Sequence, residues 1–327
     1  MRAFVIIAVC LLALTGCKKP YLDKGPLQKV TIAYTTQPDS ALVHIAVEKG
    51  FFTEEGLQVQ PQKHSYGKAA LASVLEGKAD LATAAETPIM FAALQGAKLR
   101  VVAGIFSTSK NNAIIGRKDL GILRPEDLRG RRIGYTPGTT GEFFLESYLS
   151  ANGIPIKEAE LVSLQPDQMV AALTAGQVAA VSCWNFPLTQ LRRNLGEQVV
   201  TFFDPQIYTQ TFNLVARQES VAKAPEMIRR ALRALIKAEN FALQHTEEAQ
   251  SLVATALRVD RELLREVWGG FRYKVELDRR LIITLEDQTR WAVKNRLAGS
   301  VEMPDYGSLI YLDALAAVRP DAVTIDR

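Results

Sequence analysis

From Lys29 onward, short apolar runs alternate with longer amphipathic stretches along the chain. This pattern predicts strands alternating with helices, which is typical of a parallel sheet covered by helices on both faces. The expected strands of this first passage are Val30–Tyr34, Leu57–Gln62, Leu81–Ala84 and Leu99–Phe106. The expected helices are Ser40–Lys49 and Lys68–Glu76, each followed by a glycine, and one that begins near Pro88.

The same order of elements recurs about a hundred residues later. The two passages share a register, because Pro88 comes eleven positions after Gly77 and Pro187 comes eleven positions after Gly176. The sequence therefore predicts two similar βαβ lobes. The elements expected in the second are strands Arg132–Tyr135, Glu160–Ser163 and Ala179–Cys183 and helices Gly141–Asn152 and Asp167–Ala175.

The rest of the chain is predicted to be helical, with no strong strand. The expected helices are Ala224–His245, Glu247–Leu257, Arg261–Gly269 and Leu281–Leu297. If this tail packs back on the first lobe, the second lobe is an insertion, and Asn112–Gly116 and Asn213–Ala216 are the two crossings. We therefore predict a discontinuous lobe I of residues 29–114 and 215–327 and a lobe II of residues 115–214, with a ligand cleft between them.

The N-terminus has the features of an export signal. A short positive start is followed by the apolar run Ala3–Leu14, which is too short to span a bilayer as a helix. Leu14-Thr15-Gly16-Cys17 then resembles the bacterial lipobox, which implies cleavage after residue 16 and a lipid anchor on Cys17. Residues 17–28 would be a linker to the folded body. The alternative is an ordinary secretory signal in which Cys17 is incidental.

Composition narrows the possible functions. Cys10 and Cys17 fall in or next to the signal, so only Cys183 is left in the body, and neither a disulfide nor a cysteine-based zinc site is expected. The net charge of +4 is dispersed without a basic block, which argues against a nucleic-acid partner. His44 and Glu48 have the spacing of a metal pair, but a packed or solvated helix face explains them better. No metal or cofactor is expected, and no catalytic motif was found.

Four loops that follow predicted strands are candidate ligand contacts, because ligands of parallel sheets bind at the carboxyl ends of strands and at helix N-termini. The candidate residues are Thr36, Gln37, Glu86, Thr87, Gly138, Thr139, Thr140, Trp184 and Asn185.

Three of the candidate loops also have an alternative explanation. Thr139 and Glu142 have the spacing of a helix-capping box. Trp184 either stacks on a ligand or packs under its lobe, with Asn185 orienting the ligand or capping a helix. Glu86 suits an amine, amidine or hydroxyl ligand, or else it interacts with a helix dipole. Tyr208 and Gln210 are further candidates on the hinge side.

Several segments together resemble the SsuA/TauA/THI5-like (NMT1-like) substrate-binding proteins. The matching segments are Ile45–Phe52 with Glu55-Gly56-Leu57, Leu75–Leu81, Asp127–Gly134, and Ala171–Leu173 with Gly176 and the end of the Trp184 strand. The similarity extends over roughly residues 29 to 240.

The resemblance implies a type II periplasmic-binding-protein fold with two lobes, a two-strand hinge and a helical C-terminal tail. It implies a monomeric, extracytoplasmic solute-binding component of an ABC importer, whose partners are a small ligand, the permease and the lipid bilayer. The ligand is expected to be an anion of the sulfonate, taurine or nitrate kind, or a pyrimidine. A ligand sensor for a membrane receptor remains an alternative. An enzyme on the same scaffold is less favoured, because the cysteine-rich motif of the related pyrimidine synthases is absent.

Overall fold

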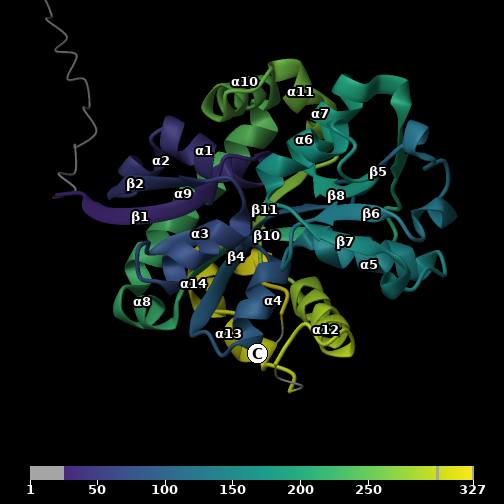
Figure 1. The fold of residues 1–327 in the computed structure, drawn as a ribbon. Helices are drawn as coiled ribbons and strands as arrows, with labels where there is room; N and C mark the ends of the chain where they lie inside the picture. Colours follow the sequence, from purple (N-terminus) through teal and green to yellow (C-terminus); the bar gives the residue numbers. More distant parts are fainter. Residues whose placement is uncertain (1–25, 300–301, 326–327) are drawn as a thin grey trace, which may run out of the picture.

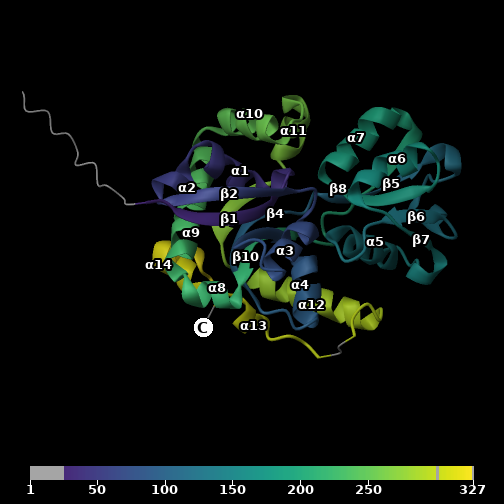
Figure 2. The same cartoon turned by 60° about the vertical axis from the view of Figure 1, so that its left-hand side comes forward.

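The computed structural model describes residues 26–299 and 302–325. The predicted signal and Cys17 therefore lie outside the described residues. The described chain forms two sheets with helices around each, as Figures 1 and 2 show. Both sheets are mixed, and their apolar strands form the centres of separate hydrophobic cores.

Sheet A has six strands in the order β11-β4-β10-β3-β1-β2. Strands β1, β2 and β3 are parallel, whereas β10 runs antiparallel to both β3 and β4. In chain order the strands are β1 (Gln28–Thr35), β2 (Leu57–His64), β3 (Leu81–Ala85), β4 (Leu99–Thr108), β10 (Gln210–Arg217) and β11 (Arg272–Glu276). The helices between the first four are α1 (Ala41–Glu48), α2 (Phe51–Glu54), α3 (Gly67–Leu75) and α4 (Glu86–Leu94).

Sheet B has five strands in the order β7-β6-β8-β5-β9. Its strands are β5 (Asn112–Arg117), β6 (Arg132–Tyr135), β7 (Glu160–Ser163), β8 (Ala180–Trp184) and β9 (Val199–Phe202), with helices α5 (Thr140–Ala151), α6 (Met169–Thr174) and α7 (Asn185–Leu195). This order repeats that of sheet A without β11, so the two predicted βαβ passages are confirmed. Gly77 and Gly176 both have positive φ, and Pro88 and Pro187 are both the third residue of the helix that follows the matching strand.

The predicted crossings are wrong in their position. Asn112–Gly116 lies in β5, between β8 and β9, and Asn213–Ala216 lies in β10, between β3 and β4. The chain passes between the sheets in the shorter segments 109–111 and 203–209. The chain therefore enters β5 directly from sheet A and enters β10 directly from sheet B. Both strands have a partner on each side, so their residues are as apolar as those of other core strands.

The tail is mostly helical, as predicted. Its helices are α8 (Gln218–Lys223), α9 (Pro225–Gln244), α10 (Thr246–Leu257), α11 (Arg261–Trp268), α12 (Arg279–Lys294), α13 (Tyr306–Leu309) and α14 (Leu312–Val318). In Figure 2, α11 lies above and α12 lies below the region where the elements of sheet A meet those of sheet B. Both touch the elements of sheet B: Arg193 on α7 pairs with Glu266 on α11, and the Trp291 indole on α12 donates to Glu146 on α5. Across the ranges 26–299 and 302–325, every helix is too short or too polar to cross a membrane.

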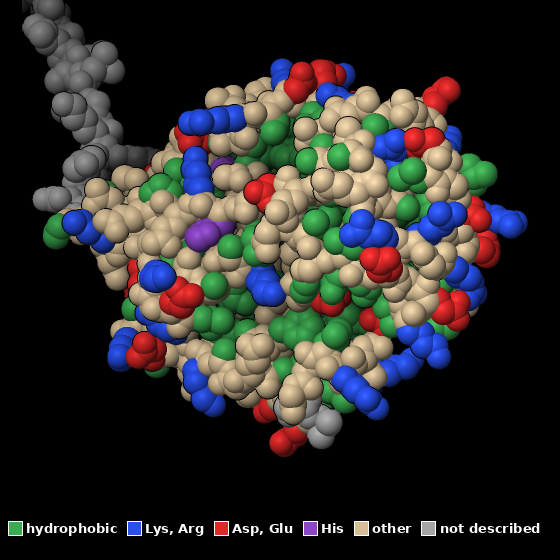
Figure 3. Space-filling model, viewed as in Figure 1, with side chains coloured by type: hydrophobic (Ala, Val, Ile, Leu, Met, Phe, Trp, Pro, Cys, Tyr) green, Lys and Arg blue, Asp and Glu red, His purple; other side chains and the backbone are tan. Residues whose placement is uncertain are grey.

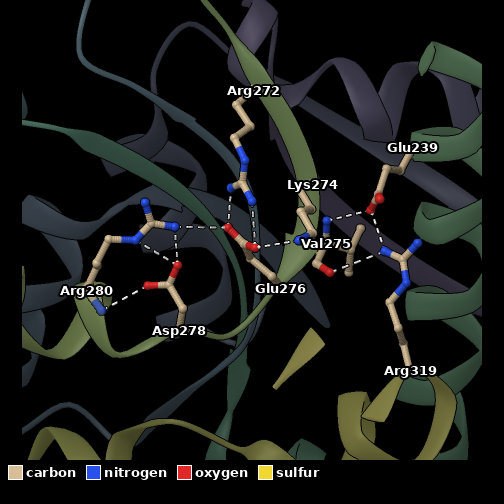
Figure 4. Close-up of polar contacts among 8 residues, drawn as sticks. All are labelled: Glu239, Arg272, Lys274, Val275, Glu276, Asp278, Arg280 and Arg319. Carbon is tan, nitrogen blue, oxygen red and sulfur yellow. Dashed lines mark hydrogen bonds and ion pairs between the residues drawn. The ribbon is translucent and has the colours of Figure 1, made fainter. Parts of the chain in front are cut away.

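Strand β11, which was not predicted, joins the tail to the edge of sheet A. Figure 4 shows why so charged a segment can pair there. The Glu276 carboxylate contacts Arg272, Lys274 and Arg280, so its negative charge is compensated at the sheet edge. On the inner side, the backbone N–H of Val275 donates to a buried glutamate of α9 at 2.7 Å. Apolar alternation did not predict this strand because most of its residues are charged.

Candidate functional site

A buried side chain from the loop after β1 meets two side chains at the junction of β8 and α7. Gln37 follows β1, Trp184 ends β8, and Asn185 begins α7. The Gln37 Oε1 atom accepts from Trp184 Nε1 at 3.1 Å and from Asn185 Nδ2 at 2.9 Å. Gln37 Nε2 donates to the carbonyl of Ser65 at 2.6 Å, which fixes the orientation of the amide. Three predicted candidates are thus brought together.

Asp39 completes this cluster, although the sequence did not single it out as a ligand residue. One carboxylate oxygen accepts from the Thr35 hydroxyl at 2.6 Å, and the other accepts from Asn185 Nδ2 at 3.3 Å. Burial raises the pKa of Asp39 to about 7, although its hydrogen bonds with Thr35, Asn185 and Ser40 favour the ionised form. Aspartate is common in turns that precede helices, so nothing in the sequence pattern was a reason to select Asp39. Its burial among the other polar groups identifies it as part of the cluster.

Asn185 has an unusual backbone conformation. Its φ is +46°, which is rare for a residue other than glycine and costs about 1 kcal/mol or more. Its backbone N–H donates to Asn111 Oδ1 at 3.1 Å, and its own Oδ1 is buried without a hydrogen-bond partner. It is therefore part of the helix and not a side-chain cap. A strained residue with an unused acceptor is a common feature of ligand sites.

The two crossing segments are tied to this cluster. Gln210 Oε1 accepts from Asn111 Nδ2 at 3.0 Å and from Asn112 Nδ2 at 2.8 Å. Asn112 Oδ1 in turn accepts from the Thr140 hydroxyl at 3.1 Å. Gln210 therefore lies on the hinge side, as predicted, and Thr140 is turned toward the crossing.

The loop before α5 satisfies its own polar groups. The backbone N–H of Gly138 donates to Glu142 Oε2 at 2.7 Å, and the Thr139 hydroxyl donates to the carbonyl of Thr136 at 2.7 Å. The predicted capping box is therefore wrong in detail, because Glu142 bonds back to Gly138 and the Thr139 side chain caps nothing. Burial raises the pKa of Glu142.

The remaining candidates lie apart from the cluster. Thr36 is half-buried and donates to the carbonyl of His64. Glu86 and Thr87 are fully buried at the start of α4 and do not line the cavity between the sheets. Glu86 accepts from the N–H and hydroxyl of Thr211 and from Gln288 of α12, and burial raises its pKa to about 7. Glu86 therefore faces the hinge and the tail.

The cavity at the cluster is almost filled. It measures about 20 Å³, and its walls include Gln37, Asp39, Thr140, Trp184 and Phe212. That volume holds about one water molecule. The two sheets therefore lie close together at the cluster, and the space left between them is too small for a solute larger than water.

The two raised carboxyl pKa values predict a stability that falls with increasing pH. Asp39 and Glu86 have folded-state pKa values of about 7, above their ordinary values of 3.8 and 4.5. The folded protein therefore binds more protons between about pH 4 and 7, and its free energy of unfolding decreases through that window. We expect wild type to melt at a lower temperature at pH 8 than at pH 5, and the difference to shrink in D39N/E86Q. An unchanged difference in the double variant would contradict the assignment.

Two chemistries are disfavoured by the surroundings of the candidate residues. No group of three His, Cys, Asp or Glu side chains within residues 26–299 and 302–325 is arranged to hold a metal. Burial raises the pKa of the Cys183 thiol to about 12, so this sulfur is not an activated nucleophile.

Comparison with known proteins gives the same fold and a family. The NMT1/THI5 like family model matches residues 37–249. The taurine-binding periplasmic protein of Escherichia coli K12 is 26% identical over 215 residues, which cover 64% of this chain and 65% of that protein. The formylaminopyrimidine-binding protein of Halalkalibacterium halodurans is 22% identical over 267 residues, or 78% and 79% of the two chains.

Solved structures also match. The alkanesulfonate-binding protein SsuA from Xanthomonas axonopodis pv. citri, bound to MOPS, superposes with a TM-score of 0.74. It is 15% identical, and the match covers 88% of this chain and 99% of that one. The periplasmic nitrate-binding protein NrtA from Synechocystis PCC 6803 gives a TM-score of 0.72 at 14% identity, covering 90% and 89% of the two chains. The predicted fold is confirmed.

Proposed function

Because the chain belongs to the NMT1/THI5-like family, we propose that it is the extracytoplasmic solute-binding component of an ABC importer. It captures a small molecule between lobe I, which is built around sheet A, and lobe II, which is built around sheet B. The observation that carries this proposal is the buried contact of Gln37 with Trp184 and Asn185, because polar groups of two separate bodies converge there with Asp39. The short crossings at 109–111 and 203–209 supply the hinge.

The cluster favours a ligand that donates hydrogen bonds. Asp39 and Gln37 are oriented as acceptors, and the Asn185 Oδ1 atom has no partner. The site that an anion would use, the N-terminus of α5, is already taken by the Glu142 carboxylate on Gly138. We therefore propose an N–H-bearing ligand, such as an aminopyrimidine or a primary amine, in preference to a simple oxyanion. Trp184 and Phe212 supply flat apolar surface beside the acceptors.

The role that we propose is binding without catalysis, by an exported and membrane-anchored protein in the periplasm or at the outer face of the cell membrane. Cys183 has a protonated thiol at neutral pH, and the metal-type clusters that hydrolysis would use are absent from the described residues. The apolar N-terminal run and Cys17 support export and lipid anchoring. The permease would recognise the closed form, because closure changes the relative position of the two lobes.

Native mass spectrometry and small-angle scattering test this proposal together. The purified chain is mixed separately with 4-aminopyrimidine, taurine, ethanesulfonate and nitrate. We expect a one-to-one adduct with 4-aminopyrimidine, no conversion of the compound, and a decrease in the radius of gyration as the lobes close. A panel that gives no adduct and no compaction would count against the function. An adduct with ethanesulfonate or nitrate alone would keep the binding role but overturn the ligand class.

A further inference from the structure

An apolar groove of about 410 Å³ opens at the edge of the cleft, next to the polar cluster. Figure 3 shows hydrophobic side chains gathered in a hollow over α3, α4 and the start of α5. Leu71, Leu75, Pro88 and Phe91 form one wall, and Leu297, just beyond α12, adds to it. Pro137, Gly138 and Glu142 line the groove from lobe II. Because both lobes supply walls, the groove is complete only when the cleft is closed.

Two residues lie between the groove and the polar cluster. Lys68 and Pro88 line both the groove and the small cavity beside Trp184. The Lys68 side chain extends from α3 toward lobe II, and its Nζ atom donates to the carbonyl of Pro137 at 2.9 Å. It passes over Gly138, where an added Cβ would lie only 2.6 Å from Nζ. The Lys68 side chain is exposed and is held by this hydrogen bond to lobe II, so a rotamer change that breaks the bond would join the two spaces into one.

We propose that this groove holds an apolar extension of the ligand. The substrate class is then a molecule with a hydrogen-bonding head and an apolar tail of several carbons, and this inference rests on the proposed function. A compact solute would leave the groove filled with water although Leu75 and Leu297 remain more than a third exposed there. A tail removes that apolar surface from water at the moment of closure, so its burial stabilises the closed form. The continuity with the cleft favours a ligand tail over a protein partner as the occupant.

Two homologous series of compounds test the inference, with calorimetry on the folded chain. The n-alkylamines and the n-alkanesulfonates are each titrated from two to eight carbons. In the series whose head binds, we expect the dissociation constant to fall roughly fourfold for each added methylene until the groove is filled. The L75S/L297S variant should flatten this dependence. Both side chains are partly exposed, so the fold tolerates these substitutions.

The outcomes separate the two claims. The matched control is L243S, which changes an exposed leucine on α9 that does not line the groove and should keep the full chain-length dependence. If short members bind but added methylenes change nothing, the groove assignment is wrong and the proposed function stands. A dependence that survives in L75S/L297S also overturns the assignment. If neither series binds at any length but 4-aminopyrimidine does, the groove assignment is wrong and the proposed function stands; if 4-aminopyrimidine also fails to bind, both are wrong.

Discussion

Replacing Arg319 with alanine is expected to lower the free energy of unfolding by about 3–5 kcal/mol. The Arg319 guanidinium lies 2.6 Å from Glu239 Oε2, and the same oxygen accepts from the backbone N–H of Val275 at 2.7 Å. The Glu239 side chain is only 5% exposed, so losing the arginine leaves a buried carboxylate with one donor. Figure 4 shows that this carboxylate joins α9 and β11 to the end of the chain. Losing the pair should therefore weaken the packing of α9, β11 and the segment after α14 against one another.

Urea denaturation followed by circular dichroism measures the loss. The matched control is R290A, which removes an arginine that pairs with Asp287 on the surface of α12 and is 56% exposed. An exposed pair of this kind contributes at most about 1 kcal/mol, so R290A should stay within that range of wild type. If R319A also unfolds within 1 kcal/mol of wild type, the buried pair does not hold the tail.

Most of the fold follows from local patterns. The alternation of apolar runs and glycine-ended helices was sufficient for the strands of both βαβ units, because buried parallel strands need nearly continuous apolar residues. The shared register of Gly77–Pro88 and Gly176–Pro187 identified the repeat because both glycines adopt positive φ after a helix. These features depend on neighbours in sequence, so sequence alone is enough to predict them.

The parts that could not be predicted depend on distant partners. Strand β11 pairs with β4, and Arg272, Lys274 and Arg280 compensate the charge of Glu276 there, which no periodicity reveals. The positions of the crossings were predicted wrongly because the segments chosen for them are core strands. A core strand has the same apolar pattern whichever sheet it belongs to. At the site, Gln37, Trp184 and Asn185 come from two separate candidate loops and meet in the structure, whereas the orientation of Glu86 toward Thr211 was decided by tertiary packing.

Asp39 is the residue whose substitution is expected to change ligand binding most. The D39N variant keeps the size and one acceptor oxygen but loses the negative charge next to Asn185. A hydrogen bond to a charged acceptor contributes about 1.5–3 kcal/mol, so affinity for 4-aminopyrimidine should fall roughly tenfold to 150-fold. Affinity for ethanesulfonate should increase in the same variant, because the repulsive carboxylate is gone. Titration calorimetry at pH 8, above the Asp39 pKa of about 7, measures both.

The comparison with E86Q assigns the effect to the cleft. Glu86 is equally buried and has a pKa raised to the same value, but it faces Thr211 and Gln288, away from the cavity between the lobes. E86Q should therefore leave both affinities within about twofold of wild type, a change of less than 0.5 kcal/mol. If E86Q weakens 4-aminopyrimidine binding as much as D39N does, the loss arises from general electrostatics or stability, and Asp39 is not the acceptor for the ligand. A pH titration adds an independent criterion, since affinity for a donor ligand should rise as Asp39 ionises and that rise should be absent in D39N.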